Sequence, residues 1–228
     1  MTDDGDRDEA GDRGSYLGFI AHEVRNPLST ALWSAELLGR MAPEERGGAR
    51  GERLSAMCLR SIARVRQLVE DHLLCERLDV GGIPLRPEAL SPRELVDAIL
   101  AKPADRGEVS ADLDAGLAVE ADRTLVERAL DSLLAAAGAE GAPVRVTARV
   151  EGSHVAITVT GHPPPPGGLE DPQKGSPSDS RGRALALPLA RRIARALDGT
   201  LTASQTGYVL SLPRAAAYIA RPKPAAPA

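Results

Sequence analysis

Three residues near the start of this chain, His22, Glu23 and Asn26, have side chains and a spacing suited to chemistry. On a helix, side chains four positions apart are neighbours, so Asn26 lies one turn from His22 on the same face. The Glu23 carboxylate can hold one imidazole N–H, so that the other ring nitrogen points outward as a nucleophile. A phosphoryl group could reach that nitrogen without entering a pocket. A zinc site of the H-E-x-x-H type is excluded, because position 26 is Asn rather than His.

The segment that carries these residues is predicted to be helical, because its apolar and small residues alternate at spacings of three and four. They are Leu17, Ile20, Val24, Pro27, Ala31, Ser34, Leu38 and Met41. In this heptad pattern His22 falls on the outer face, away from the seam. Pro27 lies inside the helix and removes one backbone donor, which should bend the helix there.

A second helix is predicted from about Glu52 to Leu78, after a polar loop at 42–50. Its expected apolar stripe contains Leu54, Cys58, Ile62, Val65, Val69 and Leu73. Together the two helices predict an antiparallel hairpin over residues 14–80, preceded by a disordered acidic tail at 1–13. One hairpin cannot enclose its own apolar stripes, whereas two can do so as a four-helix bundle, so we expect a homodimer.

The remainder of the chain predicts a second domain at 81–213, in which helices alternate with mostly antiparallel hairpins. The strongest hairpin signal is the pair of alternating segments 144–150 and 154–160, and a final hairpin is expected at 201–212. A Pro-rich loop fills 161–182, a helix is expected from 183 to 197, and 214–228 reads as a Pro/Ala tail. The expected fold class is α+β, a helical hairpin followed by a two-layer α/β sandwich.

Composition narrows the possible partners and surroundings. The chain has 228 residues, a formal charge of −4 and only five aromatic residues, which argues against nucleic-acid binding. No apolar run approaches the length of a membrane span and no secretory signal is present, so we expect a cytoplasmic protein that does not bind membranes. Cys58 and Cys75 lie 17 positions apart and are expected to be free thiols.

The segment His22-Glu23-Val24-Arg25-Asn26-Pro27-Leu28, preceded by Phe-Ile-Ala and followed by a helical hairpin, resembles the H-box of two-component sensor histidine kinases. In that family the His accepts the phosphoryl group and the next acid assists autophosphorylation. The residue four positions later assists dephosphorylation of the partner regulator. The resemblance therefore implies these roles for His22, Glu23 and Asn26.

The second domain is similar to the ATP-binding sandwich of the same family, but it departs from the family at the residues that bind nucleotide. Ala136 stands where the family has a Mg²⁺-ligating Asn, and Gly161 stands where it has the acid that binds adenine. Ala184 and Ala186 replace glycines of the phosphate-binding loop, which approaches phosphates through backbone amides. We therefore expect no bound nucleotide cofactor and no metal.

These observations predict a histidine phosphotransferase-like component of a phosphorelay, in which His22 exchanges a phosphoryl group with response-regulator aspartates. The resemblance implies that the regulator's acidic pocket supplies the Mg²⁺. Receiver domains are expected to contact Arg25, Ser29, Thr30 and Trp33, together with the facing part of the second helix. For Trp33, core packing is the first interpretation and an interface anchor is the alternative. Two other functions stay open: an active ATP-dependent kinase with a divergent pocket, and a non-catalytic module that docks regulators. Whether the chain is an enzyme is left open with them.

Overall fold

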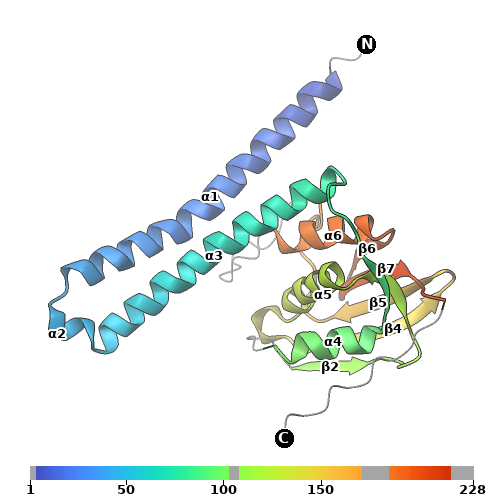
Figure 1. The fold of residues 1–228 in the computed structure, drawn as a ribbon. Coiled ribbons are helices and arrows are strands. Elements are labelled where there is room, and N and C mark those ends of the chain that lie inside the picture. The colour runs from blue at the N-terminus through green and yellow to red at the C-terminus, as the bar shows by residue number, and fades with distance from the viewer. Residues whose placement is uncertain (1–3, 103–107, 171–184, 217–228) are drawn as a thin grey trace, which may run out of the picture. The chain divides into compact units, whose positions relative to one another are not determined.

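The computed structural model describes residues 4–102, 108–170 and 185–216 (Figure 1). The chain divides into two compact units, one built from the residues up to Leu74 and the other mainly from Cys75 onward. The first unit is helical and carries His22. The second unit contains both β-sheets.

The first unit is a helical hairpin, as the two apolar periodicities predict. Helix α1 spans Asp4–Arg40, the short helix α2 spans Pro43–Arg46, and α3 spans Ala49–Asp79 (Figure 1). The expected disordered tail is wrong for residues 4–13, which continue α1; residues 1–3 lie outside the described part. The predicted loop at 42–50 is also shorter, because α2 and the start of α3 occupy most of it.

The seam between α1 and α3 buries most of the stripe predicted for α1. Five of its members are less than a tenth exposed: Ile20, Pro27, Ala31, Ser34 and Met41. The Ser34 hydroxyl is satisfied within the helix, since it donates to the Thr30 carbonyl at 2.7 Å. The prediction is wrong for Leu17, whose exposure in the hairpin is 56%.

The apolar stripe predicted for α3 is only partly the face that is buried in the hairpin. Leu54 and Leu68 are buried, whereas Ile62, Val69 and Leu73 are about half exposed. The residues turned toward α1 include Arg64, which contacts Glu23 of α1. Because α3 is apolar over more than one face, its periodicity alone does not identify the face that meets α1.

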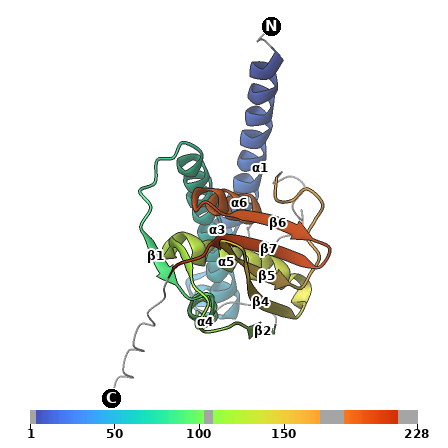
Figure 2. The same cartoon turned by 90° about the vertical axis from the view of Figure 1, so that its right-hand side faces the viewer.

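The second unit confirms the α+β class and its mostly antiparallel strands. A five-stranded sheet has the order β2-β4-β5-β7-β6, in which β2 and β4 are parallel and the other pairs are antiparallel. A separate antiparallel pair joins β1 and β3. The helices α4, α5 and α6 cover one face of the large sheet (Figures 1 and 2). The elements are β1 Pro87–Leu90, α4 Pro92–Leu100, β2 Val109–Asp112, β3 Val119–Asp122, α5 Arg123–Ala137, η1 Ala139–Gly141, β4 Val144–Glu151, β5 His154–Thr160, α6 Ala186–Ala196, β6 Thr200–Ser204 and β7 Gly207–Pro213.

The core of this unit is built from cross-strand pairs on one face of the sheet. Val159 of β5 lies opposite Tyr208 of β7, and Ile157 lies opposite Leu210. All four side chains are at most 1% exposed. Successive inward positions on a strand are two residues apart, which is the alternation that predicted the hairpin.

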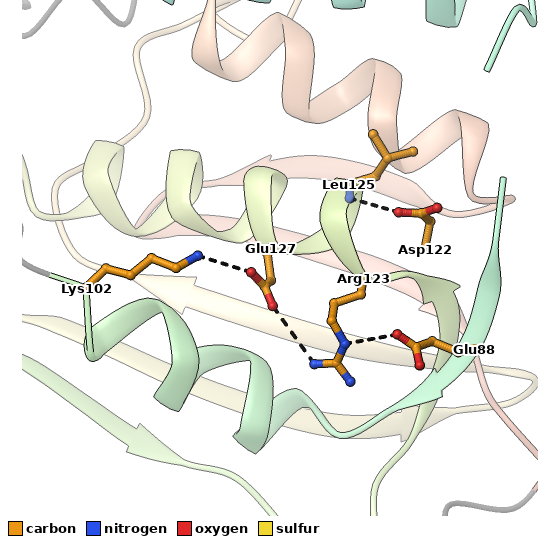
Figure 3. Close-up of polar contacts among 6 residues, drawn as sticks. All are labelled: Glu88, Lys102, Asp122, Arg123, Leu125 and Glu127. Atoms are coloured by element: carbon orange, nitrogen blue, oxygen red, sulfur yellow. Dashed lines mark hydrogen bonds and ion pairs between the residues drawn. The ribbon is translucent and has the colours of Figure 1, made fainter. Parts of the chain in front are cut away.

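Polar contacts fix α5 to its neighbours (Figure 3). Asp122 caps the helix by accepting a hydrogen bond from the Leu125 amide at 3.2 Å. Arg123 pairs with Glu88 of β1 at 2.9 Å, and Lys102, beyond the end of α4, pairs with Glu127 at 3.1 Å.

The C-terminal segment is ordered further than its composition predicts. The Arg214 amide donates to the Ser153 carbonyl at 2.9 Å, and the Ala215 amide donates to the Ala118 carbonyl at 3.1 Å. The predicted tail therefore starts too early at 214, and residues 217–228 lie outside the described part. The helix predicted over 183–197 corresponds to α6, which spans Ala186–Ala196, and positions 183 and 184 of that prediction lie outside the described residues.

The buried Tyr208 hydroxyl predicts how the free energy of unfolding changes at alkaline pH. Burial raises the pKa of its hydroxyl from the ordinary 10.0 to about 12. Between these values the unfolded chain releases a proton that the native state keeps, so stability is lost as the pH rises. The contribution is complete below pH 10. We expect the free energy of unfolding to fall above pH 10 by up to about 1.4 kcal/mol per pH unit more in the wild type than in Tyr208→Phe. Urea unfolding of both proteins at several pH values measures this difference, and parallel pH profiles would contradict it.

Candidate functional site

His22 lies on the outer surface of α1, as its heptad position predicts. Its side chain is 66% exposed, and its Nδ1 atom lies 3.6 Å from Glu23 Oε1. This distance is longer than a hydrogen bond, but contacts of this kind often tighten only when a reaction partner is bound. With Nδ1 turned toward Glu23, the Nε2 atom is the ring nitrogen left to face a reactant.

The Glu23 carboxylate faces a side chain on each of the two helices. Its second oxygen, Oε2, lies 3.4 Å from Nη2 of Arg64 on α3, and its side chain is only 20% exposed. The carboxylate thus faces an imidazole on its own helix and a guanidinium on the facing helix. Arg64 lies in the polar part of the second helix, and no local sequence signal singles it out.

A shallow open depression of about 630 Å³ lies between the two helices below His22. Asn26 lines it from α1, where its neighbour Thr30 donates a hydrogen bond to the Asn26 carbonyl at 3.2 Å. Its full lining is Asn26, Pro27, Thr30, Met57, Arg60, Ser61, Ala63, Arg64 and Gln67. The structure therefore brings Asn26 and Thr30 together with cationic groups of α3 that the sequence reasoning did not assign to a site.

The other predicted contact residues lie on the surface of α1. Arg25 and Ser29 are exposed, and Trp33 is 54% exposed. Core packing is therefore wrong for Trp33 within this hairpin. Trp33 follows His22 by eleven residues, about three helical turns, so both belong to one row along the helix.

Two described positions of the second unit, Ala136 and Gly161, carry no side chain that could bind a Mg²⁺–nucleotide as the resemblance would require. Ala136 on α5 offers no ligating atom, and the hydroxyl of Ser132, one turn earlier, donates to the Arg128 carbonyl at 3.0 Å. A Cβ built on Gly161 would lie 2.3 Å from the Ala137 carbonyl oxygen, so this backbone has no room for an acid there. These two described positions therefore offer no side-chain ligand for a Mg²⁺–nucleotide.

Two further positions of the degenerate set were expected before α6. Ala186 is the first residue of α6 and is buried, whereas Ala184 lies outside the described residues. Within the described ranges, no group of three His, Cys, Asp or Glu side chains is placed to hold a metal ion. No helix in the same ranges is long and apolar enough to cross a membrane. Neither Cys58 nor Cys75 forms a disulfide bond.

Comparison with known proteins agrees with the geometry of the hairpin. Residues 12–81 match the model of the His Kinase A (phospho-acceptor) domain. No curated protein sequence matches the chain. The match covers most of the helical hairpin that carries His22 and ends before β1, the first strand of the second unit.

Three solved structures share the fold at low sequence identity. The Acinetobacter baumannii histidine kinase AdeS is 19% identical, with a TM-score of 0.65 over 84% of this chain and 97% of that one. Full-length ShkA, solved in complex with AMPPNP, is 20% identical, with a TM-score of 0.58 over 90% of this chain and 47% of that one. Histidine kinase ThkA, solved in complex with the response regulator protein TrrA, is 17% identical, with a TM-score of 0.53 over 92% of this chain and 64% of that one.

Proposed function

We propose that this chain is a histidine phosphotransferase-like component of a two-component phosphorelay that works without ATP. The observation that carries the proposal is the exposed His22 with Glu23 at its Nδ1 atom, in a chain whose nucleotide positions carry no ligating side chains. His22 accepts a phosphoryl group from an aspartyl phosphate of one response regulator and passes it to an aspartate of another. Cytoplasmic placement is part of the same proposal.

The reaction needs little from the protein except position and charge. Nε2 of His22 attacks the phosphorus of the aspartyl phosphate, so that an N–P bond forms while the acyl O–P bond breaks. The aspartate leaves as a carboxylate, and the proton on Nδ1 stays on the ring, where the Glu23 carboxylate compensates the positive charge. The regulator's acidic pocket supplies the Mg²⁺ that neutralises the transferring oxygens.

The receiver domain is proposed to dock on the depression and on the adjoining surface of α1. Arg25, Ser29, Thr30 and Trp33 would contact it, with exposed Trp33 as an apolar anchor below His22. Asn26 lines the depression, where it can position water against the regulator's acyl phosphate. The complex of ThkA with a response regulator, which shares this fold, supports a partner of this class.

A homodimer is proposed because the hairpin leaves a second apolar face open. Leu17, Leu28 and Leu32 on α1 are all more than half exposed, as are Ile62 and Leu73 on α3. Relative to the seam, both sets are rotated in the same sense along their own helices. Because the helices are antiparallel, both sets lie on one side of the hairpin, opposite the depression. An apolar face of this size suits a second copy of the hairpin, which together would form a four-helix bundle.

The first prediction concerns the dimer. Sedimentation at tens of micromolar should give a species of twice the 23.9-kDa chain mass. Val69→Asp should weaken association at least tenfold, about 1.4 kcal/mol, because its charge would be buried without a partner. Val150→Asp is the matched control, since Val150 is 41% exposed and Val69 is 42% exposed, but Val150 lies in the other unit. A monomeric wild type would rule out this arrangement.

The second prediction concerns nucleotide. Losses of the metal ligand, the adenine acceptor and the phosphate loop affect separate parts of ATP, so they should roughly add. Titration calorimetry with ATP and Mg²⁺ up to millimolar concentration should therefore give no heat of binding. A dissociation constant below about 100 μM, equivalent to roughly 5.5 kcal/mol, would contradict the proposal and favour the divergent kinase.

The third prediction separates the carrier from the phosphatase role. His22→Gln should keep fold and dimer, because exposed substitutions usually cost less than about 0.5 kcal/mol. It should abolish uptake of acid-labile phosphate from a phosphorylated regulator, because an amide is not a nucleophile at neutral pH. Asn26→Ala leaves His22 and Glu23 in place, so uptake should persist while hydrolysis of the regulator's acyl phosphate falls at least tenfold, about 1.4 kcal/mol.

Radiolabel transfer resolved on gels, with acid and base treatment, measures both activities of these two variants. Label that survives in His22→Gln would show that another residue is the acceptor. Variants that both behave like the parent in every assay would leave the non-catalytic docking module as the function.

A further inference from the structure

Arg64 is the group of α3 that reaches the pair formed by His22 and Glu23. The separation between Arg64 and Glu23 in sequence is 41 residues, and their contact distance is 3.4 Å. Both side chains are largely covered, at 26% and 20% exposure, in contrast to the 66% exposure of His22. An ion pair that is mostly covered is screened less by salt than one on the open surface.

Glu23 needs an anchor if it is to act on His22. The two residues are consecutive, so their side chains leave the helix about 100° apart and the carboxylate must lean toward the ring. A glutamate side chain has several rotamers, and fixing it in one of them costs conformational entropy. The guanidinium of Arg64 is a planar, permanently charged partner that can offset this cost through one carboxylate oxygen.

We propose that Arg64 is the positioning residue of the acceptor site. It holds Oε2 of Glu23, which keeps Oε1 at Nδ1 of His22, which in turn keeps the proton on Nδ1 and the lone pair of Nε2 directed outward. This inference rests on the proposed function, because it assigns the group that prepares His22 for attack. Arg64 acts through Glu23 and not on the transferring phosphoryl group.

A second role for Arg64 has to be distinguished, because the residue also lines the depression in which a receiver domain would dock. A docking residue affects the regulator concentration needed for half-maximal rate. A positioning residue affects the rate at saturating regulator and the proton position on the ring of the free protein. The two roles therefore give different measurements.

The test compares Arg64→Gln with Arg64→Lys and with the control Arg66→Gln. Arg66 is two positions along the same helix, 77% exposed and paired with Glu70 at 3.5 Å, so its substitution removes an equal charge outside the site. Nitrogen-15 spectra of His22 in the free dimer, recorded above the ordinary imidazole pKa range, report whether Nδ1 or Nε2 carries the proton.

We expect the Nδ1–H form to predominate in the wild type and in Arg66→Gln. Arg64→Gln should lower the ratio of Nδ1–H to Nε2–H at least threefold and the phosphoryl uptake rate at saturating regulator at least tenfold. Arg64→Lys should recover part of both, because it keeps the charge. In a Glu23→Ala background, Arg64→Gln should cause no further change in the proton ratio, because the effect passes through Glu23.

The outcomes separate the inference from the proposed function. If the wild type takes up no phosphate, the proposed function fails, while the proton ratio still tests whether Arg64 positions Glu23. If the wild type takes up phosphate and Arg64→Gln keeps both its ratio and its saturated rate, the inference is overturned. A change only in the half-maximal regulator concentration also overturns it, since Arg64 would then be a docking residue. If circular dichroism shows that Arg64→Gln does not fold, the ratio of Nδ1–H to Nε2–H is measured in Arg64→Lys instead, alone and combined with Glu23→Ala. That ratio then tests whether Arg64 acts through Glu23.

Discussion

The packing of α1 against α3 is the constraint on which the candidate site depends. Ala31 and Ser34 of α1 are at most 5% exposed, so both lie in the seam of the hairpin. The seam fixes the rotation of α1, since turning the helix by one position would move every side chain about 100° around its axis. With the rotation fixed, His22 points outward and Glu23 turns toward α3, so one packing arrangement sets the surroundings of both residues.

In the other unit, a close approach between two stretches of backbone shapes the fold. The loop that leaves β5 meets the C-terminal end of α5, where the His162 amide donates to the Ala137 carbonyl at 2.7 Å and Gly161 leaves no space for a Cβ. The core of this unit comes from sheet side chains such as Val159 and Tyr208 and from the buried faces of the helices. None of these core positions is Ala136, so the packing of this unit does not require a ligand-binding side chain at that position of α5.

Local periodicity was sufficient to predict the hairpin, the three helices of the second unit and the two strand hairpins. It was sufficient also to predict the outward position of His22, because a heptad position depends only on neighbouring residues. Periodicity failed to identify the buried face of α3, because that helix has apolar side chains on more than one face. Ile62 and Val69 are apolar and correctly spaced for the seam but are exposed, whereas Leu54 of the same predicted stripe is buried together with Leu68, which the stripe did not include.

The contacts that complete the site could not be predicted from local sequence. Glu23 and Arg64 meet only after the hairpin has closed with a particular register and rotation, and neither property is encoded in a short motif. The depression beside Asn26 arises in the same way, from α3 residues such as Arg60 and Gln67 that are ordinary polar residues in the sequence. The helical segment 4–13 was missed for a different reason, because composition alone predicted disorder for a strongly charged stretch.

The location of Arg64 connects the mechanics of the hairpin to its chemistry. The 3.4 Å contact between Arg64 and Glu23 crosses from one helix to the other beside the seam, so it depends on the relative rotation of α1 and α3. A rotation or sliding of either helix by part of a turn changes that distance before it disturbs the exposed ring of His22. The apolar face and the depression lie on opposite sides of the same hairpin, so association on one side need not obstruct docking on the other. A shift of α3 against α1 would therefore reach His22 through the carboxylate that faces its ring.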